Sequence, residues 1–184
     1  MNRLIAFQQV MLLLVFLCIG LEASAQSIDY GDAPDPPFPT LSSGNGASHI
    51  LSPFVLGTRI DGEPDGQPNP MSNGDDFMGQ DDEDGVVFTT WLIAGQPCPV
   101  DVYATGPGFL NAWIDFNLNG SWLDPGDQIF NAVPLNPGKN TLSFTVPSST
   151  VQVGYSWSRF RFSTLPGLSF NGLSPDGEVE DYSI

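Results

Sequence analysis

The chain has 184 residues, with 21 Asp and Glu against 5 Lys and Arg, which gives a net charge of −16. This excess of negative charge excludes nucleic acid and anionic lipid as expected partners, because like charges repel. A chain of this length can bury one core, so no second domain is needed to account for it.

The first residues have the pattern of a secretory signal peptide. Arg3 precedes an apolar run at about residues 10–21, and residues 23–25 form an A-x-A cleavage pattern. The apolar run is too short for a comfortable membrane span. We therefore expect residues 1–25 to be removed after Ala25 and the remaining 159 of the 184 residues to be exported, without a membrane span. Because Arg3 and Glu22 leave together, the net charge stays at −16.

Residues 26–85 are rich in Asp, Gly and Pro and contain few periodic apolar stretches. The best strand candidate among them is HILSPFVLG, at residues 49–57. A loop region of this length inside a domain is either functional or disordered. Because its carboxylates cluster beside glycines and aromatic residues such as Tyr30 and Phe38, we expect an ordered region that is held by ions. Disorder is the alternative.

Residues 86–184 alternate between apolar and polar side chains with a period of two. The alternation predicts strands at residues 86–95, 99–105, 109–116, 140–146 and 155–163, separated by Gly and Pro turns. In the last of these, Phe160 and Phe162 lie on one face while Arg159 and Arg161 lie on the other. Short strands at this spacing predict an all-β fold, an antiparallel β-sandwich formed by residues 26–184 as a single domain.

One cysteine remains after removal of the signal peptide, so the exported chain has no internal disulfide. This residue, Cys98, lies between Pro97 and Pro99, and we expect it to behave as a small buried hydrophobic side chain. A secreted domain without a disulfide can gain rigidity from a bound metal instead.

The stretch DFNLNGSWLDPGD, at residues 115–127, begins like a calcium-binding loop. Oxygen-bearing side chains occupy alternate positions and Gly120 follows them, which is the order of ligands and turn in such loops. Position twelve, where an EF-hand has a bidentate acid, is Gly126, so the loop would be closed by a different acid on a β scaffold. The candidate ligands are Asp115, Asn117, Asn119, Ser121 through its carbonyl, Asp124 and Asp127. The alternative is a polar turn, because Asn and Asp also cap their own backbone.

Acidic side chains also cluster elsewhere, most densely at residues 81–84. Adjacent carboxylates resist ionisation unless they face water or bind a cation. The candidate metal ligands in this cluster are Asp81, Asp82 and Asp84. A solvated acidic loop is the alternative interpretation.

The C-terminal stretch DGEVEDY carries two glutamates with the same parity, Glu178 and Glu180. Arg159 and Arg161 also share one face of their strand. We expect these four residues to form structural ion pairs across neighbouring strands, with Arg–carboxylate hydrogen bonds.

Five motifs together resemble the bacterial GEVED domain. They are DYGDAPD at 29–35, DDEDGV at 81–86, NAWIDFNLNGSW at 111–122, RFRFS at 159–163 and DGEVEDY at 176–182. The resemblance implies a β-rich module of secreted or surface bacterial proteins, without an established catalytic role. It also supports the calcium interpretation, since the family usually has a similar acidic loop.

An enzyme is not expected. The single histidine, His49, has no accompanying G-x-S-x-G nucleophile motif, and a zinc hydrolase would want more histidines. The favoured function is a calcium-stabilised, extracellular or cell-surface module for adhesion or interaction. Its partner would be an unidentified extracellular protein or glycan.

Two other functions remain open from the sequence. A calcium-dependent carbohydrate-binding module would use Trp113 and Trp157, whose parity is opposite to that of the apolar residues of their strands. If a second layer covers these rings, they cannot stack on sugars. A glycosidase would use a pair of carboxylates, which the many acids supply.

Overall fold

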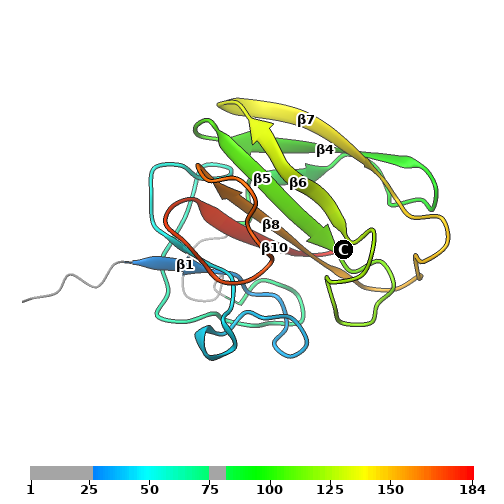
Figure 1. Cartoon of the computed structure of the whole chain (residues 1–184), viewed down its shortest axis with the longest axis horizontal. Coiled ribbons are helices and arrows are strands. Elements are labelled where there is room, and N and C mark those ends of the chain that lie inside the picture. Colours follow the sequence, from blue (N-terminus) through cyan, green and yellow to red (C-terminus); the bar gives the residue numbers. More distant parts are fainter. Residues whose placement is uncertain (1–26, 75–81) are drawn as a thin grey trace, which may run out of the picture.

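The computed structural model describes residues 27–74 and 82–184, and nearly all their regular structure is β. Figure 1 shows two antiparallel sheets packed face to face. The first consists of β5 (Gly108–Ile114), β6 (Gln128–Leu135), β8 (Trp157–Ser163) and β10 (Glu178–Ser183), in the order β10-β8-β5-β6. The second consists of β3 (Val86–Phe88), β4 (Pro97–Ala104) and β7 (Gly138–Thr145), in the order β3-β4-β7. The predicted antiparallel β-sandwich is confirmed.

Alternating apolar side chains from both sheets form the core between them. Leu110 and Ile114 on β5 and Phe160 and Phe162 on β8 have no exposed surface, as the period of two predicted. Cys98 on β4 is buried in the same core, as expected for a small hydrophobic side chain. The other face of the four-stranded sheet is therefore free to carry Arg159 and Arg161.

The prediction of a strand over residues 86–95 is too long, because β3 ends at Phe88. Its partner β4 contains Pro97 and Pro99, which have no N–H to donate. The chain leaves the sheet there, and Trp91 lies 88% exposed in the following segment.

Strand β6 was not predicted. Its pairing with β5 is interrupted by register shifts around Ala112, and Ala132 has a positive φ of 49°. Such bulges break the period of two on which sequence-based strand prediction depends.

An outer layer covers the second face of the four-stranded sheet. It contains a small sheet of β1 (Ile28–Tyr30), β2 (Ser48–Ile50) and β9 (Leu173–Ser174), in the order β1-β2-β9, and the short 3-10 helix η1 (Ser42–Gly44). Loops connect these elements (Figure 1). Residues 27–74 thus pack against the sandwich, although most of them form no regular structure. Residues 75–81 of the region expected to be held by ions lie outside the described residues, and that expectation stays a prediction.

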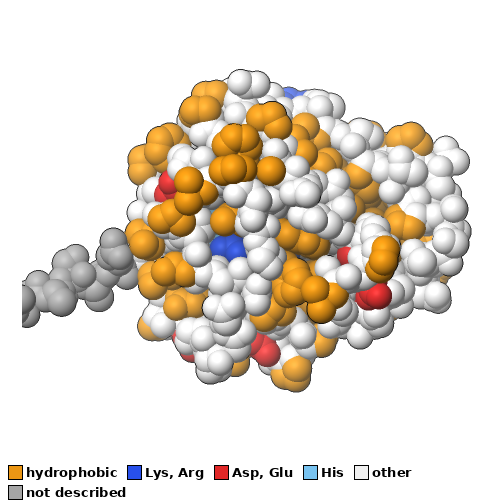
Figure 2. All heavy atoms as spheres, in the orientation of Figure 1, with side chains coloured by type: hydrophobic (Ala, Val, Ile, Leu, Met, Phe, Trp, Pro, Cys, Tyr) orange, Lys and Arg blue, Asp and Glu red, His pale blue; other side chains and the backbone are white. Residues whose placement is uncertain are grey.

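Much of the acidic charge lies inside the molecule. Figure 2 shows few acidic side chains on the face that it presents, where apolar side chains form several separate groups. Among the described residues, eight acids are buried, namely Asp29, Asp32, Asp82, Asp115, Asp127, Glu178, Glu180 and Asp181. The buried cations in the same part of the chain are Arg159 and Arg161. A solvated acidic surface therefore does not account for the composition. No helix in the described ranges is long and apolar enough to cross a membrane.

Candidate functional site

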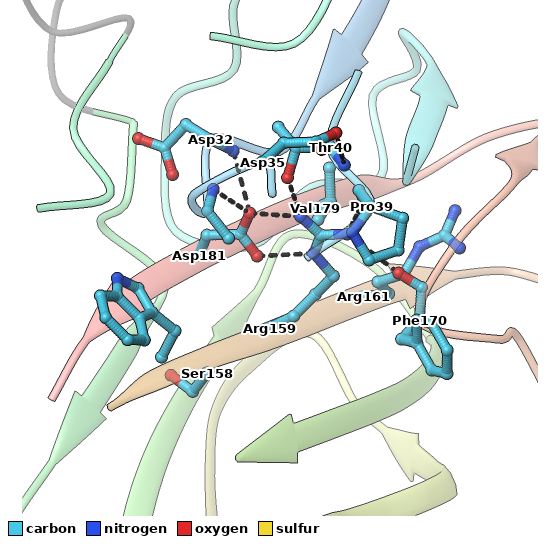
Figure 3. Close-up of polar contacts among 12 residues, drawn as sticks. Asp32, Asp35, Pro39, Thr40, Ser158, Arg159, Arg161, Phe170, Val179 and Asp181 are labelled. Atoms are coloured by element: carbon cyan, nitrogen blue, oxygen red, sulfur yellow. Dashed lines mark hydrogen bonds and ion pairs between the residues drawn. The ribbon is translucent and has the colours of Figure 1, made fainter. Parts of the chain in front are cut away.

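Arg159 and Asp181 form a buried ion pair between β8 and β10. The two residues are direct partners in the antiparallel register, and neither side chain has exposed surface. Arg159 donates Nε–H to Asp181 Oδ1 and Nη2–H to Asp181 Oδ2, both at 2.7 Å (Figure 3). This bidentate geometry is the strong form of Arg–carboxylate contact.

The remaining N–H groups of Arg159 hold the outer layer. Nη1 donates to the carbonyls of Pro39 (2.6 Å) and Phe170 (3.0 Å), and Nη2 also donates to Thr40 Oγ1 (2.9 Å). Figure 3 shows these partners converging on the guanidinium from separate loops. One arginine of the sandwich thereby fixes two segments that have no regular structure of their own.

The predicted ion pairs of Glu178 and Glu180 with the arginines are wrong. In the register of β10 with β8, Glu178 lies opposite Phe162 and Glu180 opposite Phe160. Both glutamates therefore point to the face that carries the phenylalanines, away from the guanidinium groups. The register instead places Asp181 opposite Arg159 and Val179 opposite Arg161, and no local sequence pattern gives this register.

Arg161 has no carboxylate partner within residues 27–74 and 82–184, but it uses all of its donors. Nη1 bonds to the carbonyls of Ser169 and Asn171, and Nη2 bonds to the carbonyls of Ser48 and Gly172, at 2.7 to 3.0 Å. Nε donates to Nε2 of His49 at 3.0 Å. Because Arg161 can only donate, His49 Nε2 must be the acceptor, so its Nδ1 carries the proton and donates to the Asp176 carbonyl at 2.7 Å.

His49 is thus a neutral structural residue. It is fully buried, and burial together with the nearby charge of Arg161 lowers its pKa well below the usual value. A neutral imidazole that accepts from arginine and donates to a carbonyl has no free nitrogen with which to activate a nucleophile.

Strand β10 also binds the motif DYGDAPD at residues 29–35. Val179 donates its N–H to Asp29 Oδ2 (2.8 Å), and Asp181 Oδ2 accepts from the N–H groups of Asp32 (2.9 Å) and Ala33 (2.8 Å). A Cβ on Gly31 would lie 2.4 Å from Asp181 Oδ2, so only glycine fits beside the ion pair. The motifs at the two ends of the chain therefore meet in one contact.

Glu178 and Glu180 bind backbone on the opposite face of β10. Glu178 Oε2 accepts from Leu56 N–H, and Glu180 accepts from Gly85 N–H (2.8 Å) and from the Tyr182 hydroxyl (3.0 Å). Burial, more than any other cause, raises the pKa of both, that of Glu180 to about 8. These carboxylates hold the segments before β3 and after β2 against the last strand.

The candidate calcium ligands at residues 115–127 do come together in one loop. Asp115 is fully buried and its two oxygens accept from the N–H groups of Asn119 (3.2 Å) and Gly120 (2.8 Å). Asn117 Oδ1 accepts from Asn119 N–H (3.1 Å), and Asn119 Nδ2 donates to Asp124 Oδ2 (2.8 Å). Gly120 has a φ of +78°, which suits glycine at the turn.

Ser121 uses its hydroxyl within the same loop, where Oγ accepts from Leu123 N–H at 3.1 Å. All these bonds are also those of a tight polar turn, so hydrogen bonding alone does not separate the two interpretations of the loop.

Asp127 is the residue that distinguishes this loop from an ordinary turn. Its side chain is 3% exposed, and Oδ1 makes only a long bond, 3.5 Å, with Phe116 N–H. Oδ2 is buried without a hydrogen-bond partner. Burial, and secondarily the charges of Asp115 and Asp124, raise the pKa of Asp127 to about 6. A buried anionic oxygen without a partner is costly, and a cation would satisfy it.

The chemistry of this donor set fits calcium, which prefers carboxylate, amide and carbonyl oxygens together with water. Each Asp115 oxygen keeps a lone pair beyond its single N–H bond. However, no group of three or more His, Cys, Asp or Glu side chains within residues 27–74 and 82–184 is arranged to hold a metal. A calcium ion here would need amide and carbonyl oxygens besides the acids.

The predicted cluster at residues 81–84 is only partly described. Asp81 lies outside the described residues. Asp82 is buried and its Oδ2 accepts from Asp61 N–H (3.2 Å), whereas Asp84 is exposed and accepts from Thr58 N–H (2.8 Å). The two acids thus bond to different loop residues.

Trp113 is 4% exposed and packs with Ala33, Phe38 and Trp122 in a second apolar cluster. The prediction that Trp113 stacks on a ligand is therefore wrong, because the loop at Ala33 and Phe38 covers it. Trp157 is half-buried beside Phe38, with Nε1 donating to the Pro70 carbonyl (3.2 Å). Its role in stacking stays a prediction.

Comparison with known proteins finds a family match for the C-terminal part of the chain. No curated protein and no solved structure gives a significant match. The family model of the GEVED domain matches residues 109–184, which run from β5 to the end of β10. The resemblance to the GEVED domain is thereby confirmed over residues 109–184, which contain three of the five motifs.

Proposed function

We propose that the protein is a secreted, non-catalytic module that calcium stabilises at residues 115–127 and that serves adhesion or another extracellular interaction. The observation that carries the metal part is the unpartnered, buried Oδ2 of Asp127 beside Asp115. The match to the GEVED domain supports an extracellular module. The acidic composition supports a cation as the compensating charge.

Calcium would act here by stabilising the folded loop. Asp115, Asp127 and the carbonyl and amide oxygens of the loop would hold it, since Asp115 lies within this turn and its charge acts on Asp127. A bound ion would neutralise the repulsion among Asp115, Asp124 and Asp127, and tie the end of β5 to the start of β6.

The test is the Tm of the protein in EDTA and in excess calcium, with Asp127→Asn alongside the wild type. A ligand at a hundredfold excess over its Kd stabilises the folded state by about 2.7 kcal/mol, which raises Tm by several degrees. Asp127→Asn should melt at or above the wild type in EDTA, because it removes a repelled charge. In calcium it should lose most of the shift.

Asp101→Asn is the matched control, because Asp101 lies on β4 and pairs with Lys139 outside the loop. It should leave the calcium shift unchanged. If Asp127→Asn raises Tm equally in EDTA and in calcium, the loop is a polar turn and the metal proposal is wrong.

The buried acids support the absence of catalysis. A glycosidase needs two carboxylates that reach the scissile bond. Glu178 and Glu180, which have raised pKa values, are each 1% exposed and bond to the backbone of neighbouring segments. A substrate cannot reach them in this structure.

A carbohydrate-binding function has support from a different tryptophan than the sequence indicated. Trp91 is 88% exposed and contributes to the lining of two hollows of about 550 and 490 Å³. Both are lined by Trp91, Leu92 and Ile184, and the second also by Gln152 and Asp115. An exposed aromatic ring beside hollows of this size is suited to stacking on a sugar ring.

This second candidate predicts binding to a neutral polysaccharide that Trp91→Ala abolishes. Tyr103→Ala is the control, since Tyr103 is an exposed aromatic residue on β4 that lines neither hollow. Affinity electrophoresis through gels that contain neutral polysaccharides measures the retardation. Equal retardation of both variants, or none for the wild type on any polysaccharide, removes this candidate.

A further inference from the structure

Glu178, the first glutamate of the GEVED motif, has one carboxylate oxygen that the described residues leave unsatisfied. The side chain is 1% exposed. Oε2 accepts from Leu56 N–H, whereas Oε1 is buried with no hydrogen-bond partner. Its neighbour Glu180 differs, because both of its oxygens are bonded, to Gly85 N–H and to the Tyr182 hydroxyl.

The charged side chains with the largest effect on Glu178 are all acidic. They are Glu180, Asp29 and Asp82, and their charges raise its pKa further, beyond the effect of burial. These acids come from three separate parts of the chain: β10, β1 and the segment before β3. Arg159 and Arg161 lie on the opposite face of the four-stranded sheet, where Arg159 bonds to Asp181.

A proton alone does not complete this arrangement. If Glu178 were neutral, the proton would remove its charge, but the neighbouring acids Glu180, Asp29 and Asp82 would keep theirs, and no hydrogen bond of Oε1 is present among the described residues. If it is ionised, a buried anion faces other anions. A hard cation satisfies both requirements, since it bonds to the free oxygen and neutralises the surrounding charge.

We propose that Glu178 Oε1 ligates a calcium ion that is separate from the loop at residues 115–127. The ion takes Glu178 as its direct acidic ligand. Asp29 and Asp82 act on it through ion-bound water, because no three acids of the described chain converge as direct ligands. The GEVED glutamate thereby links the last strand to the acid-rich segments that precede the sandwich.

The number of bound calcium ions per chain tests this proposal. Equilibrium dialysis against calcium, with metal analysis of the dialysed protein, gives the number for the wild type and for Glu178→Gln. Gln keeps the shape and an oxygen acceptor for Leu56 N–H but loses the charge. We expect Glu178→Gln to bind fewer ions than the wild type, and Glu180→Gln, the matched control, to bind the same number as the wild type. An unchanged number in Glu178→Gln overturns the proposal.

Asp115→Asn separates this site from the loop site. A loss of bound calcium in Glu178→Gln but not in Asp115→Asn supports the Glu178 site and contradicts the loop site. The reverse result does the opposite. Loss in each variant separately supports both sites, and a wild type that binds no calcium contradicts both.

Hydrogen exchange of the wild type keeps the test valid if Glu178→Gln does not fold. Calcium should slow the exchange of two backbone amides. One is Leu56 N–H, which donates a hydrogen bond to Glu178, and the other is Val179 N–H, which donates to Asp29. Protection that is confined to residues 115–127 overturns the proposal.

Discussion

Arg159 and Arg161 are buried on one face of β8, and each uses all five of its N–H groups. A buried guanidinium is tolerated only when its donors are satisfied. The two residues reach this state differently, since Arg159 has an ionised partner and Arg161 has carbonyls and a neutral imidazole. Loss of one partner should therefore be most costly at Arg159.

Asp181→Asn should destabilise the protein strongly. The substitution leaves the Arg159 charge buried without a carboxylate partner. Asn has one oxygen and one N–H₂ group where Asp181 has two oxygens. If the oxygen still accepts from the N–H groups of Asp32 and Ala33, the N–H₂ group points towards the guanidinium. Removal of one partner of a buried ion pair typically costs about 3–5 kcal/mol. Urea unfolding followed by tryptophan fluorescence measures the loss.

Asp101→Asn is the comparison for this prediction also. It breaks the pair with Lys139 at the molecular surface, where water screens the charges. The free energy of unfolding should change little. A similar effect of the two substitutions would contradict the structural role of the Arg159–Asp181 pair.

At the scale of elements, the motif glycines explain how tightly β10 and the first motif are fitted. Gly177 has a φ of +94°, and a Cβ there would lie 1.8 Å from the Phe162 carbonyl oxygen. Gly31 would bring a Cβ against Asp181 and Arg159. At both positions the backbone lies so close to β8 or β10 that a larger residue would clash. The same two motifs carry the carboxylates that hydrogen-bond to the neighbouring segment.

The strands that the sequence predicts well are those whose alternation is uninterrupted. On β8, Phe160 and Phe162 face the core, while Arg159 and Arg161 face the outer layer, because the period of two fixes the face of each side chain. The bulged strand β6 escaped prediction for the converse reason. The end of β3 depended on prolines in a different strand, which no local pattern contains.

Site residues were harder to predict than strands, because parity gives the face of a side chain but not its partner across the sheet. Glu178 and Glu180 share parity, as predicted, but the register places them opposite phenylalanines. The covering of Trp113 depends on Phe38, which is 75 positions away in a segment without periodicity. The loop at residues 115–127 was predictable since its contacts are local.

At the scale of the whole molecule, the outer layer has little regular structure and depends on polar contacts with the sandwich. His49 in β2, Arg161 in β8 and the Asp176 carbonyl form one continuous chain of hydrogen bonds across that boundary. The bond from Arg161 requires a neutral imidazole that accepts at Nε2, whereas the bond to the Asp176 carbonyl requires only the proton on Nδ1. The attachment of the layer should therefore depend on pH.

Acid should loosen the outer layer through His49. Arg161 and Arg159 act on this residue with repelling charges, Asp29 lies opposite it on β1, and its folded pKa is well below the usual value. The unfolded chain therefore binds the extra proton from about pH 6.5 downward, so the stabilisation is complete above that pH and is lost as pH falls through the folded pKa.

Between about pH 7 and about pH 5, the free energy of unfolding of the wild type should fall relative to that of His49→Gln, which keeps a donor and an acceptor but does not titrate. Taking the difference between the two proteins removes the opposite contribution of carboxylates with raised pKa values, such as Glu63. Parallel pH profiles for both proteins would show that His49 does not control the attachment.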